Sequence, residues 1–175
     1  MSTFSSQSST LIRAMGLDTP SPAATLTKVN HLLQLDSKGG YFITTFYGVL
    51  DLAQNSMTYC IAGHNPPVSL DAQAGSVSLL PKGGLALGIF DPVNYKDEKI
   101  SFKPGDALVL YTDGVTETNA SLGELYGNQR MLKTLQASMK KNPTEIIATL
   151  IKSLDKFKGD NPPTDDVTLL VVKRQ

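Results

Sequence analysis

The sequence lacks the features that mark three large classes of protein. It has a single cysteine, Cys60, so no disulfide forms within the chain, and a disulfide-stapled secreted domain is excluded. Sixteen basic residues are balanced by sixteen acidic ones, which leaves no positive excess to bind the phosphate backbone of a nucleic acid. No apolar run approaches the roughly 20 residues of a membrane helix, and the start of the chain lacks the basic and apolar regions of a signal peptide. We therefore expect a cytoplasmic protein that binds neither nucleic acid nor a membrane.

The remaining composition is that of a globular protein able to bury a core. Of the 175 residues, 41% are hydrophobic and 18% are charged. We expect Cys60, which lies between Tyr59 and Ile61 in a strand-like stretch, to be a small buried hydrophobe in a reducing compartment. No internal repeat, low-complexity tract or linker divides the chain, so residues 1–175 are predicted to form a single domain.

Hydrophobic spacing predicts helices near both ends of the chain and strands between them. A helix is expected over residues 1–15, where it begins without a capping residue, and a second helix opens at Ser21-Pro22, an N-cap followed by proline at N1. Stretches rich in β-branched and aromatic residues predict strands at 41–50, 57–62, 77–80, 98–102 and 107–111. The first two of these strands are expected to pair as a hairpin. Two more helices follow residue 123, the second headed by the cap Asn142-Pro143-Thr144-Glu145, and a strand over 167–172 ends the chain. This order indicates an α+β fold with helices packed on sheet faces.

Two carboxylate sites stand out because they adjoin apolar strands. Asp113 follows the buried run that ends at Tyr111, and Asp165 and Asp166 directly precede the last strand. If these two strands are neighbours, both sites project from the same edge of one sheet. Hard divalent cations such as Mg²⁺ and Mn²⁺ prefer oxygen ligands of this kind. The alternative interpretation is structural, because Asp-Gly is a common turn pair and an Asp before a strand often caps a loop.

Other kinds of site find little support. An EF-hand counted from Asp113 places Thr118 where glycine is required. The glycine-rich stretch 83–88 lacks the Gly-Lys-Ser/Thr of a Walker loop and does not open a helix. His64 follows a strand, and the sequence offers no Ser or Cys nucleophile motif with which it could act as a base. His31 lies on a helix beside two leucines. Both histidines are better interpreted as structural hydrogen-bonding groups.

Five motifs, taken in order, resemble those of one protein family. They are FYGVLD (46–51), AGHNPP (62–67), LALGI (85–89), PGDALVLYTDGVTE (104–117) and TDDVTLLVV (164–172). Their order and spacing are similar to those of the bacterial SpoIIE-type serine phosphatases, the RsbU-like branch of the metal-dependent PPM phosphatases. The resemblance runs from the first residues to residue 174. Five motifs in register make it specific, whereas any one of them alone would be weak.

The resemblance implies a fold and a reaction. The fold would be an α-β-β-α sandwich of two antiparallel sheets flanked by helices. The reaction would be hydrolysis of phosphoserine or phosphothreonine on a protein, typically an anti-sigma-factor antagonist with a STAS fold. Two Mn²⁺ or Mg²⁺ ions would bridge and activate the attacking water in the complete family site. The chain would then be a signal-transduction hydrolase that regulates a sigma factor.

The resemblance also implies roles for individual residues. Asp113 and Asp165 would be ligands of the same metal ion. Asp166 takes the neighbouring position and would support the loop rather than bind metal directly. Gly114 would let the chain swing away without crowding the ion, and Gly88 and His64 would lie near the site or support it. No catalytic side chain is implied beyond the metal ligands.

One part of the family pattern is missing from these 175 residues. Family members carry an Asp-x-Ser-Gly-x-Gly turn, whose Asp bridges both metals, ahead of a helix with which Met1 would align. The chain would therefore correspond to the C-terminal four-fifths or so of the domain, incomplete at its N-terminus. We expect at most one weak metal site, no activity from this chain alone, and an exposed sheet edge open to homodimer formation.

Three hypotheses from different classes remain open. The first is an enzyme, the C-terminal part of a SpoIIE-type phosphatase, and the retained Asp113 and Asp165 favour it. The second is a degenerate phosphatase that binds a protein partner without hydrolysis, and the missing turn favours that. An in-frame Asp-x-Ser-Gly-x-Gly directly upstream of Met1 would decide for the enzyme. The third is a purely structural domain, which would require five accidental motif matches.

Overall fold

The computed structural model describes residues 3–36, 42–120, 123–163 and 165–175. The chain folds into two compact units, one formed by Met1–His64 and Lys82–Ser101, the other by Asn65–Pro81 and Phe102–Gln175. Each unit combines one antiparallel sheet with two helices, so the predicted α+β class, with two antiparallel sheets flanked by helices, is confirmed. Among the described residues, no helix is long and apolar enough to span a membrane.

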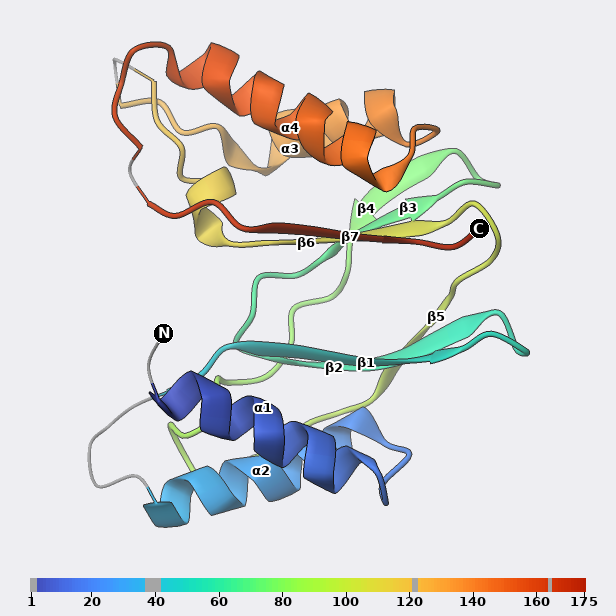
Figure 1. Ribbon diagram of the computed structural model, residues 1–175, viewed down its shortest axis with the longest axis vertical. Coiled ribbons are helices and arrows are strands. Elements are labelled where there is room, and N and C mark those ends of the chain that lie inside the picture. Colours follow the sequence, from blue (N-terminus) through green and yellow to red (C-terminus); the bar gives the residue numbers. More distant parts are fainter. Residues whose placement is uncertain (1–2, 37–41, 121–122, 164) are drawn as a thin grey trace. The chain divides into compact units, whose positions relative to one another are not determined.

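The first unit pairs the two N-terminal helices with a three-stranded sheet. The helices are α1 (Thr3–Gly16) and α2 (Pro22–Asp36). The sheet has the order β1 (Thr45–Asp51), β2 (Ser56–Ala62) and β5 (Glu98–Ser101). Strands β1 and β2 form the predicted hairpin, and both contact α2. Figure 1 shows α1 and α2 on the same side of this hairpin.

Helix α2 begins where the sequence predicts. The Ser21 hydroxyl accepts a hydrogen bond from the backbone N–H of Ala24 at 3.0 Å, which satisfies one of the unpaired donors of the first turn. The apolar stripe of the helix then packs into the core of this unit through Leu26, Val29 and Leu33, each at most 2% exposed. Burial of this stripe against the sheet is what fixes the helix in place.

Cys60 is part of the same core. It is 1% exposed, and its neighbour Tyr59 is equally buried. Burial, with a smaller contribution from the charge of Asp97, raises the pKa of the Cys60 thiol to about 11. The thiol is therefore protonated and unreactive at neutral pH, because the thiolate is the nucleophilic form. The prediction that Cys60 is a buried hydrophobe is confirmed.

The second unit combines a four-stranded sheet with the two C-terminal helices. The strand order is β4 (Ser76–Leu79), β3 (Val68–Asp71), β6 (Ala107–Tyr111) and β7 (Leu169–Lys173). The helices are α3 (Gly127–Ser138) and α4 (Pro143–Lys158). They pack against each other, and α3 contacts β3 and β4 while α4 contacts β7. Figure 1 shows the two helices over one face of this sheet.

Helix α4 is held at both its start and its buried face. The Asn142 side chain accepts a hydrogen bond from the Glu145 N–H at 2.9 Å, and the Glu145 carboxylate accepts one from the Asn142 N–H at 3.1 Å. This is the capping box that the sequence predicts. Ile146, Leu150 and Leu154 follow on one face and are buried in the core of the unit.

The structure differs from the sequence prediction in its strands. Strand β3 has no predicted counterpart, because it is only four residues long and directly follows Pro66-Pro67. The first predicted strand, 41–50, begins later, at Thr45, and its residue 41 lies outside the described residues. The link 103–106 joins strands of two different sheets. The Asp106 carboxylate closes this turn by accepting a hydrogen bond from the Lys103 N–H at 2.7 Å.

Candidate metal centre

Strands β6 and β7 are neighbours, which brings the two predicted carboxylate sites to the same end of one strand pair. Tyr111 pairs with Leu169 where the ladder ends. Asp113 lies just beyond Tyr111, and Asp165 and Asp166 lie just before Leu169. Figure 1 shows the turn after β6 and the segment entering β7 side by side at this end. The adjacency on which the sequence prediction depended is therefore present.

A threonine between β6 and Asp113 ties the two segments together. Thr112 Oγ1 donates a hydrogen bond to the backbone carbonyl of Asp166 and accepts one from the N–H of Thr168, both at 2.9 Å. The Thr112 N–H adds a third bond, to the Thr168 carbonyl at 3.2 Å. These bonds continue the β6–β7 ladder beyond its last strand pair, so the backbone on either side of the carboxylates is held in register. Thr112 lies within the motif PGDALVLYTDGVTE (104–117), but the sequence pattern assigns it no role or partner.

Gly114 is needed because the two segments approach closely. A Cβ atom at this position would lie 2.5 Å from the backbone oxygen of Asp166 and 3.0 Å from its carbonyl carbon. The carbonyl of Gly114 also accepts a hydrogen bond from Thr118 Oγ1 at 2.6 Å, and the next residue, Val115, is fully buried. The 3-10 turn Asp113–Val115 is thereby anchored on its inner side. The crowding that glycine relieves is thus with the neighbouring backbone.

The carboxylates themselves face solvent. Asp113, Asp165 and Asp166 are all exposed. Asp165 Oδ1 accepts a hydrogen bond from the Asp166 N–H at 2.7 Å, which orients that carboxylate and leaves its second oxygen available. The Asp113 carboxylate forms no hydrogen bond or ion pair with any residue in the described part of the chain. Oxygen acceptors from two different segments are thus left open at the same end of the strand pair.

The few metal-ligating side chains at this site suit a hard cation. In residues 3–36, 42–120, 123–163 and 165–175, no group of three His, Cys, Asp or Glu side chains could hold a metal ion. All the donors present are carboxylate oxygens, and Mg²⁺ in particular is often held by one or two carboxylates while keeping several waters. In the described part of the chain the exposed carboxylates of Asp113 and Asp165 thus suit a hard cation that keeps most of its water ligands.

The segments that carry these carboxylates are strongly acidic. Residues 112–126 and 159–168 together contain six Asp or Glu and no Lys or Arg. A cluster of like charges with no counter-charge in the same segments produces a negative potential, which concentrates cations and repels anions. The charges of the two segments favour a cation beside Asp113 and Asp165, while Arg130 of α3 pairs with Glu124 and Lys158 of α4 lines the pocket that Asp165 borders.

A pocket of about 280 Å³ opens beside the carboxylates. Asp165 and Asp166 form part of its wall, and apolar side chains of α4 and of the segment before β7, including Ile151, Leu154 and Val167, form much of the rest. Asp155 and Lys158 of α4 line it as well, so Asp165 and Asp166 border a hollow with both apolar and charged walls.

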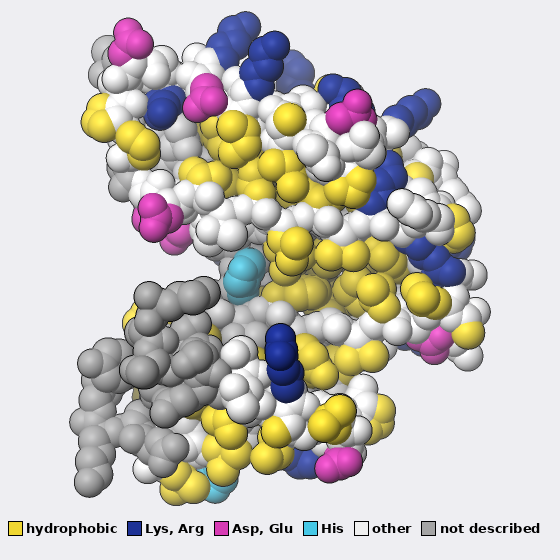
Figure 2. All heavy atoms as spheres, in the orientation of Figure 1, with side chains coloured by type: hydrophobic (Ala, Val, Ile, Leu, Met, Phe, Trp, Pro, Cys, Tyr) yellow, Lys and Arg dark blue, Asp and Glu magenta, His cyan; other side chains and the backbone are white. Residues whose placement is uncertain are grey.

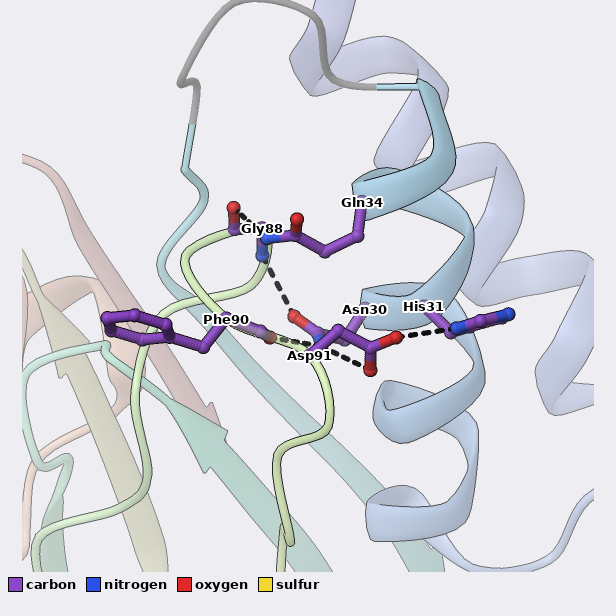
Figure 3. Close-up of polar contacts among 6 residues, drawn as sticks. All are labelled: Asn30, His31, Gln34, Gly88, Phe90 and Asp91. Atoms are coloured by element: carbon purple, nitrogen blue, oxygen red, sulfur yellow. Dashed lines mark hydrogen bonds and ion pairs between the residues drawn. The ribbon is translucent and has the colours of Figure 1, made fainter.

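Gly88 lies in the other compact unit, where α2 holds it in place. Gly88 is buried and has a φ of 87°, in the region that favours glycine. Its N–H donates a hydrogen bond to Asn30 Oδ1 at 2.9 Å, and its carbonyl accepts one from the Gln34 amide (Figure 3). Asn30 also donates to the Phe90 carbonyl at 2.8 Å. Side chains of α2 thus fix the loop 88–91.

The two histidines are in the same unit as Gly88. His31 Nδ1 lies 2.6 Å from Asp91 Oδ2 at the outer side of α2, so His31 makes the structural polar contact that the sequence predicts (Figure 3). His64 is partly buried and directly follows Gly63 at the end of β2. Because Gly88 and His64 belong to a different unit from Asp113, their part in the site stays a prediction.

The sequence matches one family model over almost its entire length. The model for stage II sporulation protein E (SpoIIE) matches residues 2–175. Protein IcfG of Synechocystis sp. is 32% identical over 133 residues, which cover 76% of this chain and 21% of that protein. The phosphoserine phosphatase RsbU of Bacillus subtilis is 30% identical over 154 residues, which cover 88% of this chain and 45% of that protein. The chain spans less than half the length of these curated relatives.

Solved structures share the fold at lower sequence identity. The SiaA-PP2C domain of Pseudomonas aeruginosa superposes with a TM-score of 0.81 at 18% identity, covering 99% of this chain and 72% of that one. The manganese-presoaked phosphatase domain of SpoIIE from Bacillus subtilis gives 0.68 at 17% identity, covering 95% and 73%. The predicted PPM phosphatase-like fold is confirmed.

Proposed function

The chain belongs to the SpoIIE family of PPM-type phosphatase domains, and on that premise we propose that it forms the hydrolytic part of a protein serine/threonine phosphatase. The proposed substrate is phosphoserine or phosphothreonine on a protein, such as an anti-sigma-factor antagonist with a STAS fold. The relative RsbU, named a phosphoserine phosphatase, supports this substrate class. The observation that carries the proposal is the Thr112 link, which holds the segments of Asp113 and Asp165 together at one end of β6–β7.

Asp113 and Asp165 are the proposed ligands of one Mn²⁺ or Mg²⁺ ion. When bound, such an ion lowers the pKa of a coordinated water and offsets charge on the phosphoryl oxygens. The choice of metals is supported by two solved neighbours, a manganese-presoaked SpoIIE phosphatase domain and RsbX in complex with magnesium. The oxygen-only donor set of this chain is consistent with either ion.

The neighbouring residues position these ligands. The Asp166 N–H donates to Asp165 Oδ1, which turns the second oxygen of that carboxylate toward other partners. The Asp166 carbonyl accepts from Thr112, and Gly114 leaves room for that carbonyl. Asp166 therefore acts through its backbone, in keeping with a supporting rather than a ligating role.

Two carboxylates supply too few ligands to hold two metal ions. We propose that these 175 residues bind one ion weakly and hydrolyse no phosphoprotein on their own, because they contain no Asp-x-Ser-Gly-x-Gly turn to supply the bridging ligand. The second candidate function is a degenerate phosphatase that binds a protein partner without hydrolysis. That candidate is favoured by the same shortage of ligands in the described part of the chain.

Calorimetric titration with MnCl₂ tests the metal ligands. The wild-type chain is expected to bind one Mn²⁺ with a Kd of about 10⁻⁴–10⁻³ M, as weak carboxylate sites do. Asp113→Asn and Asp165→Asn are each expected to weaken binding by about tenfold or more. Asp160→Asn removes a charge from the same acidic segment as Asp165 and serves as the matched control. It is expected to change the Kd by less than about twofold, because exposed charges are screened by salt.

Three outcomes separate the alternatives. Two tight sites, or equal weakening by all three variants, would contradict the assignment of Asp113 and Asp165 as a single-ion site. Mn²⁺-dependent release of phosphate from a phosphoserine protein, abolished by Asp113→Asn, would support the phosphatase and overturn the proposed inactivity of the chain alone. Binding of the phosphoprotein that survives both ligand variants, without hydrolysis, would support the degenerate module.

A further inference from the structure

Helices α3 and α4 frame a second pocket, of about 400 Å³, with a different chemistry from the metal centre. Three of its side chains are cationic, namely Arg130, Lys133 and Lys156, and three carry hydroxyls, namely Tyr126, Thr134 and Ser153. No carboxylate is among the described residues that line it. None of the lining residues belongs to the candidate metal centre, so the function proposed above leaves this pocket unexplained.

The three cations are not equivalent. Arg130 pairs with the Glu124 carboxylate, and its guanidinium lies over the Phe157 ring, 4.7 Å from the centroid. Lys133 and Lys156 are exposed and form no hydrogen bond or ion pair with the described residues. Since Glu124 balances the charge of Arg130, the two lysine charges remain uncompensated. These two exposed ammonium groups give the rim of the pocket a positive charge that attracts anions.

The hydroxyls form a connected row. Tyr126 Oη lies 2.9 Å from Thr134 Oγ1 and 2.7 Å from Ser153 Oγ. Thr134 donates its own proton to the Arg130 carbonyl at 2.8 Å, so it acts only as an acceptor toward the other two. Tyr126 therefore donates to Thr134 and Ser153 donates to Tyr126, so the three hydroxyl protons are all used within the row and at the Arg130 carbonyl. Tyr126 is 1% exposed, which fixes the inner end of the row.

The pocket lies in the most basic part of the chain. Residues 127–158 contain seven Lys or Arg and two Asp or Glu, whereas the rest of the chain contains nine and fourteen. Figure 2 shows Lys and Arg side chains gathered over α3 and α4 on the upper part of the face in view. A local positive excess in a chain without net charge raises the concentration of anions at this surface.

We propose that this pocket is a binding site for a phosphate monoester. Such a group carries a charge of about −1.5 to −2 at neutral pH and three strong acceptor oxygens. The ammonium groups of Lys133 and Lys156 match that charge, and each carries three N–H donors for the phosphoryl oxygens. A carboxylate would leave one lysine charge uncompensated and is expected to bind more weakly. The phosphate is carried either by a side chain of a polypeptide or by a small free molecule, and both present the same chemistry.

Titration of the full ¹⁵N-labelled chain with inorganic phosphate tests the site by backbone amide shifts. At neutral pH, constant ionic strength and with EDTA, saturable shifts are expected at Thr134, Ser153 and Phe157. The double substitution Lys133→Gln with Lys156→Gln is expected to raise the Kd about tenfold or more, because hydrogen bonds to charged groups are the stronger ones. The matched control, Lys140→Gln with Lys152→Gln, removes the same charge from the same helical region outside the pocket. It is expected to change the Kd by less than about twofold.

Three results would overturn the proposal: shifts that do not saturate, shifts that acetate reproduces at the same ionic strength, and equal weakening by the two double variants. A short phosphoserine peptide and free O-phosphoserine then identify the source. Tighter binding of the peptide, by about tenfold, assigns the pocket to protein-borne phosphate, and equal affinity assigns it to a small molecule. EDTA removes any ion from Asp113 and Asp165, so a negative result leaves the proposed function untouched.

Discussion

At the scale of single residues, Thr112 connects strand geometry to the candidate metal ligands. Its Oγ1 donates to Asp166 and accepts from Thr168, so the orientation of the hydroxyl is fixed from both sides. The Thr112 hydroxyl bonds to Asp166, and the two candidate ligands are the sequence neighbours of these residues: Asp113 follows Thr112, and Asp165 precedes Asp166. Removing the hydrogen bonds of Thr112 is therefore expected to change the distance between the two carboxylates, although neither aspartate is substituted.

Thr112→Val preserves the shape of the side chain and removes both hydrogen bonds of the hydroxyl. At about 1 kcal/mol for each bond, the free energy of unfolding is expected to fall by about 1–2 kcal/mol. The Kd for Mn²⁺ is expected to rise severalfold, because the ligand segments are no longer held in register. Thr112→Ser keeps the hydroxyl and is expected to restore both quantities. Urea unfolding measures the first quantity, and calorimetric titration with MnCl₂ measures the second.

Thr149→Val supplies the control for loss of a threonine hydroxyl. Thr149 Oγ1 donates to the Glu145 carbonyl at 2.6 Å on α4 and takes no part in the carboxylate segments. This substitution is expected to leave the Mn²⁺ affinity unchanged. A folded Thr112→Val chain with wild-type affinity would show that the hydroxyl does not position the ligands.

The sequence identifies Asp113 and Asp165 but not the residues that organise their surroundings. The two aspartates are visible because a charge directly beside an apolar strand is a local pattern. Thr112 and Asn30 are not visible in this way, because their partners are remote. Thr112 bonds to a residue 54 positions away, and Asn30 to one 58 positions away. Such long-range hydrogen bonds form only after the sheet and the helix have packed, so no local sequence pattern predicts them.

At the scale of helices and strands, prediction succeeds where a segment is specified by its own residues. Strand β6 (Ala107–Tyr111) has the predicted bounds, since a continuous apolar run is bounded by a turn on one side and Asp-Gly on the other. The strands with which β6 pairs could not be predicted in the same way. β5 precedes β6 in the chain but pairs with β2, while β6 pairs with β3 and β7. The choice of partner is made by long-range packing, which neighbouring sequence does not encode.

Helix α4 is the element on which both pockets depend. Ile151 and Leu154 line the hollow beside the carboxylates, whereas Ser153 and Lys156 line the basic pocket. Because residues on opposite faces of one helix serve the two pockets, the position of α4 along its axis matters to each. The capping box at Asn142 sets where that helix begins.

Asn142→Ala removes the side-chain acceptor of this capping box. The free energy of unfolding is expected to fall by about 1 kcal/mol, the usual cost of losing an N-cap. For a chain of this size the melting temperature is expected to fall by about 2–4 °C. Differential scanning calorimetry measures the change.

Two further variants separate capping from general disturbance of the loop. Asn142→Asp keeps an acceptor and adds a charge that suits a helix N-terminus, so it is expected to match the wild type or exceed it. Thr144→Ala alters a neighbouring exposed residue that takes no part in the box and is expected to have little effect. A loss from Asn142→Asp as large as that from Asn142→Ala would contradict the assigned role.

At the scale of the whole molecule, a net charge of zero conceals a separation of charge within the second unit. The segments 112–126 and 159–168 contain only acidic charges, six in number, while residues 127–158 contain seven basic and two acidic ones. Cations are thereby favoured at the candidate metal centre and anions at the basic pocket. The two binding chemistries proposed for this unit follow from one uneven distribution of charge.

Ion-exchange chromatography at pH 7 distinguishes this distribution from the net charge. The formal net charge at that pH is zero, yet retention on a cation exchanger at low salt is expected, with release as the Debye length falls toward about 8 Å. Replacing Lys133, Lys140, Lys152 and Lys156 by Gln is expected to abolish retention. The matched variant replaces four lysines of the first unit, Lys28, Lys82, Lys96 and Lys99, and is expected to elute near the wild type. Both variants lose the same four charges, so equal loss of retention would show that net charge governs binding. Retention lost only when Lys133, Lys140, Lys152 and Lys156 are replaced would instead locate the anion-binding surface on residues 127–158.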